Sequence, residues 1–198
     1  MENLNQSLFL WLNASADASH AGVLLATILA EQAIWLVPIV LTISWLRGSE
    51  QIRKLMIEAT AAGLTALLLN QLIGLVWYHP RPFEIGLGHT LIAHVVDSSF
   101  PSDHLALLWA VGFSFLLHAR LRRVGALLAL LGLPMAWARI YLGVHFPLDV
   151  MGAAMVAGLS AWLCFRQERR FVEPTFHWAT AIHRRLFAPL IRRGWVRQ

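Results

Sequence analysis

The chain has 198 residues, of which 58% are hydrophobic and 14% charged, and its mean hydropathy is +0.59. An ordinary soluble domain carries about 25% charged residues, so this composition excludes a disordered chain, a nucleic-acid-binding module and a disulfide-rich secreted scaffold. It predicts a membrane protein. The chain is nevertheless basic, with 16 Lys and Arg against 11 Asp and Glu, and the positions of these charges carry information.

Six segments of helical character follow one another along the chain. Residues 4–13 mix apolar and polar side chains, are too short to span a bilayer, and predict an interfacial helix anchored by Trp11. Because a spanning helix needs about 20 apolar residues, we expect about five spans, at residues 21–46, 55–77, 102–118, 124–140 and 147–165. The predicted fold class is all-α, a polytopic membrane helix bundle. Residues 1–165 form the membrane-embedded domain and residues 166–198 a basic cytoplasmic C-terminal tail.

The positive charges predict the orientation. Fourteen of the 16 Lys and Arg residues follow the first span, follow the third span or belong to the tail. Five spans place these three groups on one side, which must be cytoplasmic, and the tail is expected to meet anionic lipid head groups. Arg81 and Arg139 fall on the outer side, where topology gives them no role. They are therefore candidates for ligand contacts.

Three segments converge on the outer side, at residues 77–83, 100–104 and 138–149. Arg81 and Arg139 offer guanidinium forks that match phosphate oxygens. Ser102 stands where it can cap the third span, whose first N–H groups favour an anion. This group of residues predicts a phosphate-binding site.

The same segments contain a candidate nucleophile. Asp149 follows His145 by four residues and can hold one ring nitrogen, which leaves the other nitrogen free to attack phosphorus. His104 can then protonate the leaving oxygen. A metal is the competing explanation for two His and an Asp. The neighbouring arginines disfavour a cation, however, and the His spacing matches no compact metal motif.

These motifs carry a family resemblance. Arg81-Pro82, Pro101-Ser102-Asp103-His104, and Arg139, His145 and Asp149 in the pattern Arg-x5-His-x3-Asp resemble the three signature motifs of the type 2 phosphatidic acid phosphatase superfamily. Within it, the chain is similar to the bacterial undecaprenyl-diphosphate phosphatase branch. The resemblance covers about residues 20–165, with the motifs in the right order and spacing.

The resemblance implies a role for each matching position. His145 would be the nucleophile, Asp149 its orienting partner and His104 the general acid, acting through a phosphohistidine without a metal or other cofactor. The substrate-binding set would be Arg81, Ser102, Asp103 and Arg139. The implied reaction converts undecaprenyl diphosphate to undecaprenyl phosphate and phosphate at the outer face of the bacterial inner membrane, which recycles a carrier of cell-wall precursors. The implied partner is thus a polyprenyl diphosphate lipid and not a nucleic acid.

Two positions depart from the family pattern. Many members have Lys seven residues before the first-motif Arg, where this chain has Gly74, so one phosphate contact is missing or supplied otherwise. Asp103 stands where Gly is common. Its carboxylate would repel an anion unless paired, and we expect Arg81 or Arg139 as its partner.

Several polar residues near the motifs have open roles. Glu31, inside the first span, either lines the site or makes a structural hydrogen bond. Asn70 and Gln71 are expected to make hydrogen bonds between helices. Glu84 and Asp97 flank the site in the loop, where each either tunes pKa values, holds the loop or is a plain solvated acid. A surface role is the default expectation for His79, His89 and His94 in the same loop.

Other functions stay open on the sequence. Phosphatidate or phosphatidylglycerol phosphate are alternative substrates, and a phosphotransferase would move the phosphate onto a lipid such as lipid A. A lipid or anion transporter would bind without cleavage. It needs no nucleophile, so the pairing of His145 with Asp149 counts against it.

Overall fold

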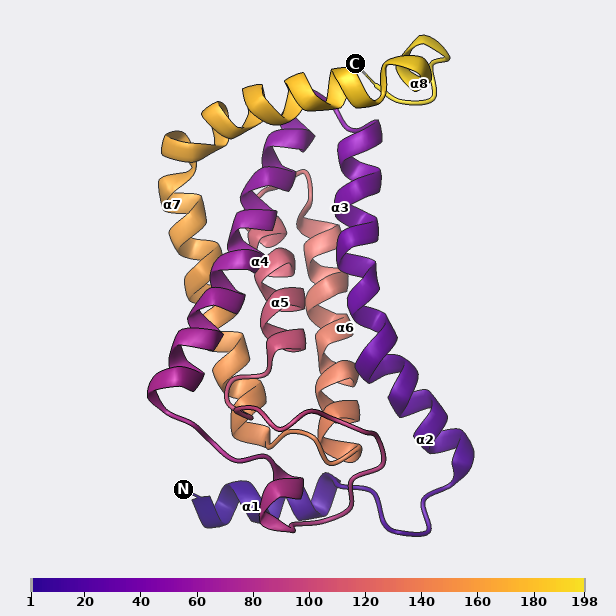
Figure 1. Ribbon diagram of the computed structural model, residues 1–198, viewed down its shortest axis with the longest axis vertical. Helices are drawn as coiled ribbons and strands as arrows, with labels where there is room; N and C mark the ends of the chain where they lie inside the picture. The colour runs from indigo at the N-terminus through magenta and orange to yellow at the C-terminus, as the bar shows by residue number, and fades with distance from the viewer. Residues whose placement is uncertain (1, 198) are drawn as a thin grey trace.

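In the computed structural model, which describes residues 2–197, the chain forms a helix bundle without strands among those residues (Figure 1). Helix α1 (Glu2–Leu12) lies across one end of the bundle. The first long helix is composite and joins α2 (His20–Thr27), a π-helical segment (Ile28–Gln32), a 3-10 turn (Ala33–Trp35) and α3 (Leu36–Arg47). The further elements are α4 (Glu50–Val76), a 3-10 turn (Pro82–Ile85), α5 (Asp103–Leu116), α6 (Arg122–Tyr141), α7 (Pro147–Leu186) and α8 (Ala188–Arg192).

The predicted membrane bundle is confirmed. Four helices are long and apolar enough to cross a membrane, namely the composite helix His20–Arg47, α4, α6 and α7, and α5 is a shorter apolar helix. With 14 residues, α5 is about 21 Å long at 1.5 Å per residue. Figure 1 shows that α5 begins deeper in the bundle than the neighbouring ends of α6 and α7. The candidate active site lies at this end of α5.

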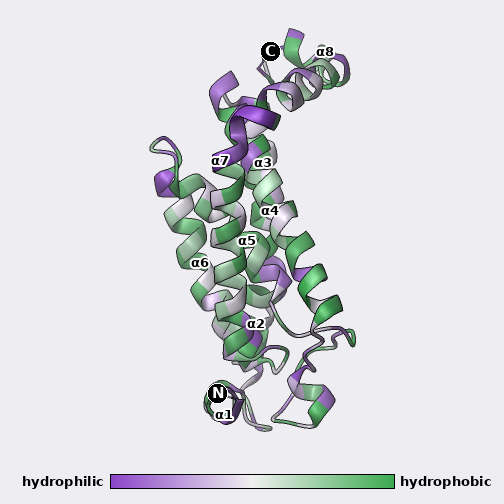
Figure 2. Ribbon diagram, turned by 90° about the vertical axis from the view of Figure 1, so that its left-hand side faces the viewer, coloured by the Kyte–Doolittle hydropathy of each residue, from purple (hydrophilic) through white to green (hydrophobic). Residues whose placement is uncertain are grey.

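Small side chains allow the helix backbones to approach closely. On α4 and α7 the buried small side chains are alanines, namely Ala59, Ala62, Ala66, Ala153, Ala157 and Ala161. A Cβ atom on Gly63 would lie 2.8 Å from a methyl carbon of Leu107 on α5. Large apolar side chains face outward instead, as Leu64 and Leu75 show with 62% and 83% exposure. Figure 2 shows hydrophobic ribbon along the bundle and hydrophilic ribbon concentrated towards its ends. Such a surface requires an apolar solvent.

The C-terminal segment differs from the predicted tail. The fifth span was expected to end at residue 165, but α7 continues to Leu186, and Figure 1 shows its second half lying across the ends of α3 and α4. Lys54 of α4 binds Glu173 at 2.8 Å. Charged residues end an apolar run, yet Arg, Glu and Gln are good helix formers. The helix therefore persists where the apolar pattern stops.

Candidate active site

His145 lies in the short turn between α6 and α7 and is buried. Gly143 permits this turn with a φ of +81°, and a Cβ atom there would collide with the carbonyl oxygen of His89. Pro147 then opens α7, because its fixed φ suits the first helical position. The turn and the helix start thus hold the His145 ring in place.

Asp149, in the first turn of α7, orients that ring. Its Oδ2 lies 3.2 Å from His145 Nδ1 and accepts the backbone N–H of Phe146 at 2.7 Å. The hydroxyl of Ser99 donates to the same oxygen. An ionised carboxylate only accepts, so His145 Nδ1 carries the hydrogen and Nε2 keeps its lone pair. A nucleophilic imidazole needs this tautomer.

Arg81 lies against Nε2, the other nitrogen of that ring. Its Nε donates to Asp97 Oδ1 at 2.7 Å, and its Nη1 donates to the carbonyl oxygen of Val144 at 2.8 Å. The same Nη1 lies 3.3 Å from His145 Nε2. The backbone N–H of Arg81 also donates to Glu84 at 2.8 Å. A buried positive charge therefore stands where Nε2 would meet a phosphoryl group.

Arg139 enters the site from α6. Its Nη1 donates to the carbonyl oxygen of Ala30 at 3.1 Å, and its Nη2 donates to His94 Nε2 at 3.2 Å. Ala30 belongs to the π-helical segment, a deviation often found at functional sites. Among the described residues, the buried Arg139 Nε has no partner. Because an unpaired buried donor is costly, this N–H suits an anionic ligand. Glu31 belongs to the same π-helical segment and follows Ala30, whose carbonyl oxygen accepts from Arg139.

The N-terminus of α5 supplies two more residues. Ser102 occupies the N-cap position as predicted, but its side chain makes no capping hydrogen bond. Its buried hydroxyl has no partner within residues 2–197. His104 is partly buried, interacts electrostatically with Arg139 and Arg81, and makes no ring hydrogen bond within the same part of the chain. Both side chains are thus free to engage a ligand.

Asp103 is not paired as the sequence led us to expect. Asn70 Nδ2 donates to its Oδ1 at 2.8 Å, and Gln71 Nε2 donates to its Oδ2 at 2.9 Å. The expected pairing with Arg81 or Arg139 is wrong, because both arginines point to other acceptors. The expectation for Asn70 and Gln71 is confirmed, since these bonds join α4 to α5. They position the first turn of α5.

A cavity of about 230 Å³ adjoins Arg81 and is lined by Gly74, Asp97 and Asp103, among others. A Cβ atom on Gly74 would lie 3.1 Å from Cβ of Ser98. The site loop thus packs closely where many family members have Lys. A longer side chain at Gly74 would displace this loop.

Three loop residues help to build the site, although the sequence left the role of Asp97 open, favoured a surface role for His94 and indicated none for Ser99. Asp97 binds Arg81, His94 accepts from Arg139, and Ser99 donates to Asp149. The only sequence signal was their place between the first two motifs, since a loop of this length without regular structure is commonly functional.

The charges around His145 determine its protonation. Burial lowers the pKa of His145 well below its ordinary value, and the positive charges of Arg139 and Arg81 lower it further. Burial also lowers the pKa of His94. His145 is therefore neutral at pH 7, as an attacking group must be.

The family follows from comparison with known proteins. The model of the PAP2 superfamily matches residues 55–173, a stretch that contains all three motifs. The chain belongs to this superfamily, whose members are lipid phosphatases.

Two relatives with similar sequences support membership in this family. YbjG of Escherichia coli (strain K12), which is named as an undecaprenyl-diphosphatase, is 36% identical to this chain over 201 residues. The alignment covers 100% of this chain and 99% of YbjG. The undecaprenyl-diphosphatase BcrC of Bacillus subtilis (strain 168) is 40% identical over 138 residues, 70% of each chain.

Two solved structures show the same fold. Aquifex aeolicus LpxE aligns with a TM-score of 0.68 at 23% identity, over 82% of this chain and 95% of its own. A PAP2-type phosphatidylglycerolphosphate phosphatase from Bacillus subtilis aligns with a TM-score of 0.58 at 15% identity, over 86% and 87%.

Proposed function

We propose that this protein hydrolyses undecaprenyl diphosphate to undecaprenyl phosphate and phosphate through a phosphohistidine on His145. The proposed site faces outward from the bacterial inner membrane. The enzyme would thereby return a lipid carrier for cell-wall precursors. The names of the relatives at 36% and 40% identity point to this substrate.

One observation carries the proposal. Asp149 holds His145 Nδ1 at 3.2 Å, so Nε2 is the ring nitrogen that carries the lone pair. Arg81 Nη1 lies 3.3 Å from that nitrogen. A phosphoryl oxygen that takes this N–H would bring its phosphorus next to the nucleophile.

The residues support a two-step reaction. His145 Nε2 forms a bond to the terminal phosphorus while the bond from this phosphorus to the bridging oxygen breaks. The bridging oxygen leaves with undecaprenyl phosphate and takes a proton from His104, whose protonated form is stabilised by the negative charge of the bound diphosphate. Water then attacks the phosphohistidine and gives a proton to His104, which releases phosphate and restores His145.

The unused donors of the site would stabilise the transferred group. The buried Arg139 Nε and Ser102 Oγ lack partners in the described chain, and phosphoryl oxygens accept from such groups. Electrostatic stabilisation is the main protein contribution to phosphoryl transfer. The outward orientation is supported by the fourteen basic residues assigned to the opposite side.

Purified protein with radiolabelled terminal phosphate tests the chemistry. We expect wild type to release inorganic phosphate without a lipid acceptor, and His145→Ala to release none and take up no label. His104→Ala should accumulate an acid-labile, base-stable labelled protein. Phosphate release at the wild-type rate by His145→Ala would overturn the phosphohistidine.

A substrate panel in detergent tests the lipid. Undecaprenyl diphosphate should be cleaved faster than phosphatidate and phosphatidylglycerol phosphate. Faster cleavage of either phospholipid would replace the proposed substrate and leave the chemistry intact. Transfer of the label to added lipid A, with no free phosphate, would identify a phosphotransferase.

A further inference from the structure

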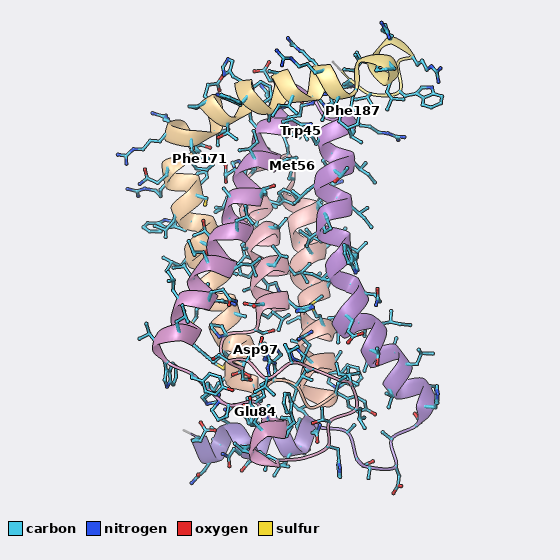
Figure 3. All side chains as sticks on the ribbon, viewed as in Figure 1. Trp45, Met56, Glu84, Asp97, Phe171 and Phe187 are labelled. Atoms are coloured by element: carbon cyan, nitrogen blue, oxygen red, sulfur yellow. The ribbon has the colours of Figure 1, made fainter. Side chains whose placement is uncertain are left out.

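A second cavity lies at the end of the molecule opposite the candidate active site. It has a volume of about 510 Å³, within the range of about 300–1,000 Å³ that holds a ligand-sized molecule. Figure 3 places Trp45, Met56, Phe171 and Phe187 around the space between α3, α4 and the second half of α7, whereas Asp97 marks the active-site end. We call this cavity the roof groove.

The lining of the roof groove is almost wholly apolar. Leu41 of α3, Leu64 of α4 and Ala179 of α7 belong to its three walls. The neighbouring face of α7 exposes large apolar side chains, with Trp178 at 77% and Leu186 at 69%. A helix of this kind lies in the interface of a bilayer. The groove therefore opens towards lipid.

The second half of α7, which covers the groove, is hydrogen-bonded to the bundle. The indole N–H of Trp45 donates to His183 Nδ1 at 3.2 Å, so His183 Nε2 carries the hydrogen and donates to the carbonyl oxygen of Arg197 at 3.0 Å. Arg53 Nη2 donates to that same carbonyl oxygen at 2.7 Å. The groove is thus a built feature of the fold.

A cavity of about 800 Å³ with a mixed polar and apolar lining adjoins the roof groove, because Leu46 lines both. Its other lining residues include Arg47, Trp195 and Arg197. Two guanidinium groups and an indole ring are typical of a site for a lipid phosphate at the membrane surface. The two cavities together match a molecule with an apolar chain and an anionic head.

We propose that the roof groove and the adjoining cavity bind one anionic glycerophospholipid of the inward-facing leaflet. One acyl chain occupies the groove, and the phosphate lies between Arg47 and Arg197. Net positive charge near this cavity favours an anionic over a zwitterionic head group. This lipid is not a substrate, because the nucleophile lies at the opposite end of the bundle.

Native mass spectrometry of the full chain in detergent tests the proposal. Wild type, titrated with dioleoyl phosphatidylglycerol, should bind one molecule with a Kd about tenfold lower than for dioleoyl phosphatidylcholine, as expected for two nearby arginines. Thr60→Phe and Ala179→Phe fill the groove from two walls. Each should raise the phosphatidylglycerol Kd about tenfold through lost chain burial.

Leu72→Phe is the matched control, because Leu72 is exposed on the same helix and lies outside the groove. It should bind like wild type. Phosphatase activity within about twofold of wild type shows that each variant is folded. Unchanged binding in both filled variants would overturn the proposal, and so would equal affinity for the two lipids.

Cross-linking of the wild-type protein keeps the proposal testable without any variant. A phosphatidylglycerol with a diazirine in one acyl chain should label residues 41–64 and 171–187. Labels spread evenly over the outer surfaces of the bundle would show a general lipid annulus and refute a specific site.

Discussion

Two histidine–carboxylate pairs lie at opposite ends of this bundle and behave differently. At the active-site end, His145 Nδ1 lies 3.2 Å from Asp149. At the other end, His118 Nε2 lies 3.0 Å from both oxygens of Glu58, a buried carboxylate of α4. The contact geometry is similar, but the neighbouring charges are not.

These charges assign each pair its role. The hydrogen bond that His118 donates to Glu58 raises the pKa of His118, and the negative charges of Glu58 and Glu168 raise it further. Arg139 and Arg81 instead lower the pKa of His145 beyond the effect of burial. One pair is an ion pair that joins the turn after α5 to α4, and the other holds the neutral imidazole that we propose as the nucleophile. A histidine–carboxylate contact alone therefore does not identify a catalytic residue.

Removal of each histidine tests this contrast most strongly. His145→Ala should lower kcat by at least about 10⁴-fold, as loss of a nucleophile does in other enzymes. His118→Ala, the matched change, should leave kcat within about twofold. Phosphate release from undecaprenyl diphosphate measures both. A large loss of kcat in His118→Ala would mean that the pair of His118 and Glu58 also contributes to the reaction.

Substitution of the two carboxylates, Asp149 and Glu58, should give the same contrast in kcat, with a smaller loss. Asp149→Asn should lower kcat about 10³-fold, because an amide can donate to Nδ1 and favour the wrong tautomer. Glu58→Gln should keep kcat and lower the melting temperature. The comparison fails if both variants lose activity to the same extent.

Asp97 tests whether a loop carboxylate positions Arg81. Asp97→Asn should lower kcat/KM about tenfold, since Arg81 Nε loses a charged partner at 2.7 Å. Glu2→Gln, a change of another exposed acid, should have no effect. An unchanged kcat/KM in Asp97→Asn would leave Val144 as the main support of Arg81.

The smallest expected effect concerns pH and stability. The folded pKa of His118 is raised, so its stabilisation is complete below pH 6.5 and is lost as pH rises through the folded pKa. The melting temperature of the wild type should therefore decrease by about 2–4 °C as the pH rises from 6.5 through the folded pKa of His118. His118→Gln should reduce that decrease, whereas an unchanged pH dependence would argue against the ion pair.

The helices and the proximity of His145 to Asp149 could be predicted, because both depend on the local pattern of the sequence. Apolar runs of spanning length predict helices, and the i, i+4 spacing of His145 and Asp149 predicts their proximity on a helix start. The course of α7 beyond residue 165 was not predictable, because charged residues end a span without ending a helix. The partners of Asp103 were also missed, since the sequence does not show that Arg81 and Arg139 are already engaged.

The sequence by itself determined the class of protein, the spans and the three motifs, because hydropathy and spacing act locally along the chain. Tertiary structure decided that His145, one of nine histidines, is buried beside two arginines and has a lowered pKa, because a pKa depends on burial and on charges brought in from other parts of the chain. It also decided that Asp97, His94 and Ser99 support the site. Their contacts with Arg81, Arg139 and Asp149 join residues far apart in sequence, and only the packed bundle brings them together.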